Sequence, residues 1–172
     1  PRSDGKCSIH DRPAHIAERQ TPGHWEADCM LFSAPGPGIL VAHERYSRIT
    51  FAFAQQNLKA DPIADSLAQL LEPFAPELRQ SITFDNGTEF SRHQRIADQL
   101  SIQTYFCDPR APWQKGGVEN AIGRLRRALP RKTNLETLPQ ERLNAIIANH
   151  NHTPRKCLAF KTPAETFNPL HS

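Results

Sequence analysis

The alternation of apolar and polar residues predicts three strands near the start of the chain. From Trp25 to Phe32, residues of the two kinds alternate with the period of two that is typical of a strand. A run with two Pro and two Gly, Ala34–Gly38, ends this strand. Two further strands are expected over Ile39–Glu44 and Ile49–Gln55. Three strands this close in sequence imply an antiparallel meander.

After these strands the pattern predicts helices that alternate with short strands. Asp61 followed by Pro62 indicates a helix start, with the aspartate as N-cap and proline at the first helical position. The sequence then predicts strands over Ser81–Asp85 and Ile102–Cys107, and helices over Phe90–Leu100, Val118–Leu129 and Gln140–Asn149. The remaining residues, through Phe167, are expected to form a helical tail packed on the core.

This order of elements predicts an α/β fold. An antiparallel hairpin that leads through right-handed crossovers into parallel strands gives a mixed five-stranded sheet, three antiparallel strands then two parallel, with helices on both faces. Residues 1–22 are polar and contain Pro13 and Pro22, so we expect an extended leader with little regular structure. Residues 23–172 are expected to form one domain.

Composition indicates a globular protein that does not enter membranes. Apolar residues make up 38% of the chain, and the apolar runs are too short to cross a bilayer. No segment has the pattern of a secretory signal, and the chain begins at Pro1, so we expect a domain excised from a longer cytoplasmic protein. Cys29 and Cys107 lie in apolar strands and favour buried thiols over a disulfide.

Charge is distributed unevenly along the chain. Residues 1–109 carry 10 Lys and Arg against 14 Asp and Glu, whereas residues 110–161 carry 11 against 3. A basic second half suits a polyanion such as DNA, although it can also form a solvated face. Charge alone leaves both interpretations open.

Three carboxylates are candidate catalytic residues and metal ligands. Asp28 lies in mid-strand among apolar residues, where an unpaired carboxylate would cost several kcal/mol, so it needs a cation or a hydrogen-bond donor. Asp85 ends its strand directly before Asn86-Gly87, where a substrate can approach the sheet. Glu119 begins a helix. Each also has a purely structural interpretation, as a paired aspartate, a turn residue and a helix-dipole partner respectively.

If the three carboxylates converge, they require a cation between them. Mg²⁺ and Mn²⁺ prefer oxygen ligands of this kind. Two such ions, about 3.5–4 Å apart in the DNA-bound state, would stabilise the attacking and leaving oxygens of an in-line phosphoryl displacement. Glu26 is expected on the same strand face as Asp28, either as a fourth acidic group or in a structural role.

The surroundings of the three carboxylates resemble a known family. Asp28 within Gly-His-Trp-Glu-Ala-Asp, Asp85 within Thr-Phe-Asp-Asn-Gly-Thr-Glu-Phe, and Glu119 within Pro-Trp-Gln-Lys-Gly-Gly-Val-Glu-Asn are similar to the three motifs of DDE transposases and retroviral integrases. The chain more closely resembles bacterial insertion-sequence transposases of the IS-thirty family, through Tyr-Phe-Cys-Asp-Pro, Leu-Pro-Arg-Lys-Thr-Asn-Leu and Lys-Thr-Pro-Ala-Glu. The likeness runs from about Pro22 to Phe167.

The resemblance implies a ribonuclease H-like fold and a Mg²⁺- or Mn²⁺-dependent polynucleotidyl transferase. Such an enzyme cleaves transposon ends with water and joins the 3′-hydroxyl to target DNA, and synapsis of two ends implies at least a homodimer on DNA. Asp28, Asp85 and Glu119 match the family's metal ligands. The family's usual N-terminal helix-turn-helix has no counterpart in this sequence, so specific end recognition is not expected of it. A ribonuclease H-type nuclease and a catalytically silent DNA-binding scaffold remain alternatives.

Candidate DNA contacts lie around the third carboxylate. The stretch from Asn120 to Leu135 contains five Lys and Arg and no acid, which predicts phosphate contacts with little base readout; a solvated helix face is the alternative. Trp113 lies in the preceding loop and would stack on a base or pack beneath the loop. The candidate DNA-binding residues are Trp113, Gln114, Lys115, Asn120, Arg124, Arg126, Arg127, Arg131 and Lys132.

Two further groups of residues have simpler interpretations. The histidines lack the spacing of a zinc site, and His150 and His152, near a helix end, are expected on the surface. Asn120, next to Glu119, is expected to orient that carboxylate or a DNA phosphate rather than to bind a metal.

Overall fold

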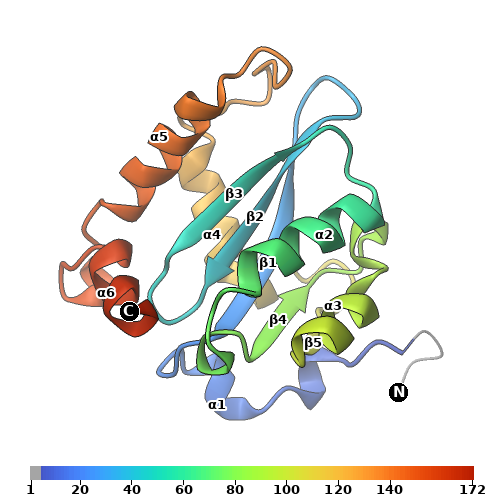
Figure 1. Cartoon of the computed structure of the whole chain (residues 1–172), viewed down its shortest axis with the longest axis vertical. Helices are drawn as coiled ribbons and strands as arrows, with labels where there is room; N and C mark the ends of the chain where they lie inside the picture. Colours follow the sequence, from blue (N-terminus) through green and yellow to red (C-terminus); the bar gives the residue numbers. More distant parts are fainter. Residues whose placement is uncertain (1–4) are drawn as a thin grey trace.

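The computed structural model describes residues 5–172, which form one five-stranded sheet in the order β3-β2-β1-β4-β5 (Figure 1). Antiparallel pairing joins β1 (His24–Leu31) to β2 (Gly38–Glu44), and β2 to β3 (Thr50–Gln55). On the other side of β1, parallel pairing adds β4 (Ser81–Phe84) and then β5 (Gln103–Phe106). The predicted mixed sheet of three antiparallel and two parallel strands is therefore confirmed.

Helices cover both faces of the sheet, as the α/β, ribonuclease H-like prediction requires. α2 (Ala60–Leu71) and α3 (His93–Leu100) lie on one face, and α4 (Gly116–Leu125) and α5 (Gln140–Asn151) on the other (Figure 1). α6 (Pro163–His171) follows α5. Short 3-10 helices occupy Ile9–Asp11, Pro76–Leu78, Thr88–Phe90, Pro112–Lys115 and Lys156–Leu158. Among the described residues, no helix is long and apolar enough to cross a membrane.

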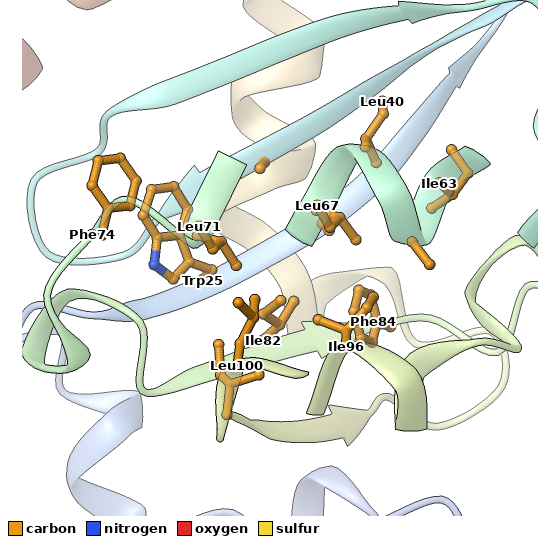
Figure 2. Packing of buried hydrophobic residues seen from close by; sticks show 14 of the residues in the cluster. Trp25, Leu40, Ile63, Leu67, Leu71, Phe74, Ile82, Phe84, Ile96 and Leu100 are labelled. Carbon is orange, nitrogen blue, oxygen red and sulfur yellow. The ribbon is translucent and has the colours of Figure 1, made fainter. Parts of the chain in front are cut away.

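Each face of the sheet has its own apolar core. On the α2 face, Trp25 stacks on Phe74 with ring centroids 5.9 Å apart, and Leu71 packs beside them (Figure 2). On the α4 face, Val118 and Leu143 pack with residues of β1 and β2. Full burial of such side chains contributes roughly 1.5–3 kcal/mol each, so the second core fixes α4 against the sheet.

Several helix boundaries differ from the prediction. Lys59, not Asp61, is the N-cap of α2, and Asp61 lies in the first turn, 3.1 Å from Arg92 Nε. Pro62 is tolerated there because the N–H groups of a first turn have no partner within the helix. Of the stretch Phe90–Leu100, only the part from His93 is α-helical.

The helix that carries Glu119 is also displaced from its predicted bounds. It begins at Gly116, before the expected Val118, and ends at Leu125, from which turns continue to Leu129. The next residue is Pro130, and a residue that precedes proline is disfavoured in the helical conformation. Pro130 therefore explains why no helix continues beyond Leu129, although it does not set the end of α4 at Leu125.

The first described residues lie against the sheet. Ser8 forms a bridge with Phe106 of β5, and α1 (Ala14–Ala17) buries Ile16. Arg12 Nη1 donates a hydrogen bond to Thr83 Oγ1 at 3.0 Å. In its described part, residues 5–22, the predicted leader thus has short regular elements only, and contacts with the sheet position it.

Candidate active site

Asp28 lies on the face of β1 that α4 covers. Its side chain is 18% exposed, and its Oδ2 lies 3.0 Å from Lys115 Nζ. Its Oδ1 accepts a hydrogen bond from the backbone N–H of Cys29 at 2.8 Å. The expectation that a carboxylate at this position needs a cation or a donor is confirmed, because it has both.

Asp85 follows the last residue of β4, next to β1 in the sheet. The parallel register aligns Glu26 with Thr83, so Asp28 and Asp85, each two residues further on, lie at the same level, where β4 has ended and β1 continues. Asp85 Oδ1 accepts a hydrogen bond from the N–H of Gly87 at 2.8 Å, which fixes the carboxylate at the turn. Its side chain is 41% exposed.

Lys115 lies between these two aspartates. Its side chain is 2% exposed, and its Nζ is 3.7 Å from Asp85 Oδ2 as well as 3.0 Å from Asp28 Oδ2. Burial alone would lower the pKa of Lys115, but the charges of Asp28 and Asp85 outweigh burial and raise it. The ammonium is therefore a buried counter-ion, which does not fit the predicted role of a DNA contact in a surface loop.

Glu119 is exposed in the first turn of α4, one turn after Lys115. Burial raises the pKa of its carboxyl, Lys115 lowers it, and Asp28 is among the acids that raise it. A cleft of about 360 Å³ is lined by Asp85, Lys115 and Glu119 together with the loop after β5. Within the described part of the chain, however, no three His, Cys, Asp or Glu side chains lie close enough together to hold a metal ion.

Glu26 fixes the start of α4. Its Oε2 accepts a hydrogen bond from the backbone N–H of Val118 at 2.7 Å, and its Oε1 pairs with Arg45, both side chains being buried. A Cβ at Gly117 would lie 2.9 Å from His43 Nε2, so glycine permits the close approach of helix and sheet. Of the two roles considered for Glu26, the structure shows the structural one.

Comparison with known proteins identifies the family. The integrase core domain matches residues 18–112, which is more than half of the chain and includes Asp28 and Asp85. The chain belongs to the integrase core domain family. This agrees with the resemblance in sequence motifs and with the mixed sheet.

Several insertion-sequence proteins are similar to this integrase core. It is 36% identical over 158 residues to the transposase for insertion sequence element IS1086 of Cupriavidus metallidurans, covering 92% of the chain and 47% of that protein. It is 36% identical over 157 residues to the transposase InsI for insertion sequence element IS30A of Escherichia coli, covering 91% and 41%. For the transposase of IS4351 from Bacteroides fragilis the identity is 29% over 166 residues, covering 96% and 51%. The chain spans about half the length of the curated relatives it matches.

Glu89 is an acidic residue of the integrase core that the sequence analysis did not single out. It lies in the 3-10 helix Thr88–Phe90, just after Asp85. Burial raises the pKa of the Glu89 carboxyl, and the charges of Asp85 and Asp28 raise it further. Its position in sequence, four residues after Asp85 and in the same motif, could have indicated that it lies near the candidate site.

The candidate DNA-binding residues separate into exposed and structurally engaged side chains. Trp113 is 74% exposed, so of its two predicted roles packing beneath the loop is wrong and base stacking stays a prediction. Gln114 is engaged with Asp108, whose backbone N–H donates to Gln114 Oε1 at 2.7 Å. The exposed candidates on and after α4 are Asn120, Arg124, Arg127, Arg131 and Lys132.

Arg126 differs from its neighbours. Its Nη2 donates a hydrogen bond to the carbonyl of Leu31 at 2.6 Å, and its guanidinium lies 4.8 Å from the centre of the Phe32 ring. These contacts tie the end of β1 to α4. Arg126 therefore stabilises the fold at this point, where the sequence predicted a DNA contact.

The predicted environments of the histidines and cysteines can be compared with the structure. His150, expected on the surface, is buried in α5, whereas His152 is exposed as predicted. Within residues 5–172 all four cysteines are free, Cys107 is buried and Cys29 is partly buried. Burial raises the pKa of Cys107 to about 11, so this thiol stays protonated at neutral pH.

The donor set of the site suits a divalent cation. Asp28 and Asp85 already share one cation, the Lys115 ammonium, and the cleft beside them extends to Glu119. Hard carboxylate oxygens are the ligands that Mg²⁺ and Mn²⁺ prefer. The type of donor therefore suits the metal that the sequence motifs imply, although among the described residues the three carboxylates do not converge on one point.

Proposed function

We propose that this integrase core is the catalytic domain of a bacterial DNA transposase, a Mg²⁺- or Mn²⁺-dependent enzyme that cuts a DNA strand and joins its 3′-hydroxyl to target DNA. The observation that carries the proposal is the pair of carboxylates, Asp28 in β1 and Asp85 just after the neighbouring parallel strand β4, which face one cation, the Lys115 ammonium. Glu119 lies in the adjoining cleft.

In this proposal Asp28, Asp85 and Glu119 hold the metal, as two ions when DNA is bound. The ions supply Lewis-acid stabilisation of the attacking and leaving oxygens. Lys115 neutralises the two aspartates in the free protein, and a metal held by the same oxygens would take its place as their counter-ion. Glu26, through Val118 and Arg45, holds the start of α4 so that Glu119 faces the cleft.

DNA is the proposed partner, both as transposon end and as target. Trp113, Arg127, Arg131 and Lys132 have exposed side chains and would contact the strand beside the cleft. Because two transposon ends must be brought together, we propose at least a dimer on DNA. The relatives with bacterial hosts favour action in the cytoplasm.

A strand-transfer assay tests the proposal. A labelled duplex with a recessed 3′-hydroxyl is incubated with supercoiled plasmid, Mn²⁺ and either wild type or the Asp28→Asn, Asp85→Asn or Glu119→Gln variant. We expect joined product from wild type and a loss of at least about 100-fold in each variant, since each removes a charged metal ligand.

Other outcomes would favour the alternatives. Cleavage of an RNA–DNA hybrid without joining would support a ribonuclease H-type nuclease. Neither cleavage nor joining, with DNA still bound, would support a catalytically silent scaffold. Activity that survives in all three variants would overturn the assignment of these carboxylates.

A further inference from the structure

A second cavity lies on the opposite flank of α4 from the carboxylates. Its volume is about 420 Å³, and Gly116, Asn120 and Arg124, one helical turn apart from each other, form its α4 wall. Lys115 and Glu119 lie on the other side of the helix and line the cleft of the proposed active site. The two cavities therefore share α4 as a partition.

Four arginines from distant parts of the chain line this cavity. Arg19 comes from the segment after α1, Arg48 from the turn between β2 and β3, Arg124 from α4 and Arg155 from the segment after α5. Within the described residues, no Asp or Glu is among the lining side chains. We refer to this cavity as the arginine pocket.

The arginine pocket concentrates positive charge, and no acidic side chain of the described residues lines it. Glu26, which lies behind Gly117, is already paired with Arg45 and with the N–H of Val118. Burial lowers the pKa of Arg155, and the charge of Arg124 lowers it further, which reflects repulsion between the two guanidinium groups. An anion in the pocket would relieve this repulsion.

The arginines keep hydrogen-bond donors for such an anion. Arg155 Nη2 donates to the carbonyl of His150 at 2.7 Å, and Arg48 Nη1 donates to the carbonyl of Arg45, so each side chain is held in place by one contact. A guanidinium has five N–H donors, so most remain. In the described part of the chain, the side chains of Arg19 and Arg124 make neither a hydrogen bond nor an ion pair.

The floor of the arginine pocket adds a further polar group. His43 lines the pocket and lies opposite Glu26 of β1 in the sheet. Its Nδ1 is hydrogen-bonded to Thr50 Oγ1 at 3.1 Å. Its Nε2 is buried and has no hydrogen-bond partner among the described residues. A buried polar atom of this kind is satisfied by a ligand or by water.

We infer that the arginine pocket is a phosphate-binding site that holds a phosphate of the DNA backbone, apart from the proposed metal site. A guanidinium group can donate two parallel hydrogen bonds to two oxygens of one phosphate. The cavity volume of about 420 Å³ is large enough for a phosphate with its sugar. A helix with its side chains is about 10–12 Å wide. At about 3.4 Å per nucleotide, a phosphate some three nucleotides from the scissile one would reach across α4. This position on the strand rests on the proposed function.

The test compares two double variants that remove the same charge. Arg19→Gln/Arg124→Gln alters the pocket through the two side chains that hold no protein partner. Lys59→Gln/Arg142→Gln alters two exposed residues that line neither cavity. Binding of labelled single- and double-stranded oligonucleotides is measured by fluorescence anisotropy in EDTA at several salt concentrations, after thermal melting has shown that both variants are folded.

We expect the pocket variant to bind at least about 10-fold more weakly than wild type, with a salt slope smaller by about 1–2, and the control variant to change less than about 2-fold. If wild type binds 5′-phosphorylated oligonucleotides more tightly than 5′-hydroxyl ones and the pocket variant does not, the pocket binds a terminal phosphate. If the pocket variant loses the same affinity for both kinds of oligonucleotide, the pocket binds an internal phosphate. Equal affinity of the two double variants, or no binding by wild type, would overturn the inference.

The metal-free measurement keeps this inference separable from the proposed function. Wild type that binds DNA through the pocket but neither cuts nor joins it with Mn²⁺ would contradict the proposed function alone. Wild type that joins DNA while the pocket variant binds like the control would contradict the pocket alone.

Discussion

The buried Lys115 Nζ lies 3.0 Å from Asp28 Oδ2, and the same ammonium is 3.7 Å from Asp85 Oδ2. Two carboxylates at this end of the sheet are thus compensated by a residue of the same chain. The ammonium stands where a divalent cation would be shared by the same oxygens. Metal binding and the Lys115 contacts therefore compete in this account.

Lys115→Met should lower stability without metal and strengthen metal binding. Removing the ammonium leaves Asp28 and Asp85 to repel each other, which we expect to cost roughly 1–3 kcal/mol because both keep some contact with solvent. In thermal melts, the increase in melting temperature in Mn²⁺ relative to EDTA should be larger for the variant than for wild type. Lys132→Met, at an exposed position, is the control. An equal Mn²⁺ gain in wild type and variant would rule out competition.

Glu26→Gln should destabilise the fold through Arg45. The glutamine can still accept the N–H of Val118, but the buried guanidinium loses its counter-charge, at a cost of about 3–5 kcal/mol. Urea denaturation measures the loss, with Glu136→Gln, exposed after α4, as the control. A change below about 1 kcal/mol would show that the ion pair does not hold α4.

Trp113→Ala should weaken single-stranded DNA binding without a loss of stability. Trp113 is 74% exposed and Trp25 is 1% exposed, so DNA should quench the fluorescence of Trp113 alone. Stacking on a base is worth about 1–3 kcal/mol, which predicts a loss of about 5-fold in affinity or more. Phe160→Ala removes another exposed ring as the control. Unchanged affinity, or quenching that persists in the variant, would remove the stacking role.

Acid should destabilise the protein between about pH 6.5 and 4, partly through His24. Burial, and then the charges of His15, Arg45 and Arg12, lower the pKa of His24 from 6.5 to about 4. Between these values the unfolded chain binds a proton that the folded chain does not. The free energy of unfolding therefore decreases as the pH decreases, by at most about 3 kcal/mol for this residue. Below the folded pKa this loss is complete.

His24→Asn tests that contribution. Asparagine can replace the contact of His24 Nδ1 with Ser81 Oγ, which is 2.8 Å long, without the titration. The free energy of unfolding, measured at several pH values, should fall less steeply in the variant over this range. His43 and His150, whose pKa values are also lowered, keep part of the slope. Parallel curves for variant and wild type would contradict the assignment.

The sheet could be predicted from sequence because its signals are local. Strand periodicity, the break at Ala34–Gly38 and the preference for right-handed crossovers together predict the mixed sheet of three antiparallel and two parallel strands that the structure shows. Helix ends were less accessible. α4 begins at Gly116 because Glu26, far away in sequence, accepts the N–H of Val118 and because Gly117 can lie against His43.

The candidate site divides in the same way. Asp28 and Asp85 could be predicted as candidates because each carboxylate lies in or directly after an otherwise apolar strand. The role of Lys115 could not, since a lysine in a polar loop gives no sign that folding will bury it between them. The structural contact of Arg126 could not be predicted for a similar reason, because its partner, the carbonyl of Leu31, becomes a neighbour only in the folded chain. The arginine pocket likewise exists only in tertiary structure.

Anomalous scattering from Mn²⁺ tests the central claim most directly. Crystals of wild type and Asp85→Asn, grown with and without a DNA duplex, would be soaked in Mn²⁺; the asparagine can keep the contact with the N–H of Gly87. The account predicts a peak between Asp28 and Asp85 in wild type, with Lys115 displaced, and no such peak in the variant. No peak in wild type, with DNA or without, and Lys115 still seated between the aspartates would contradict it.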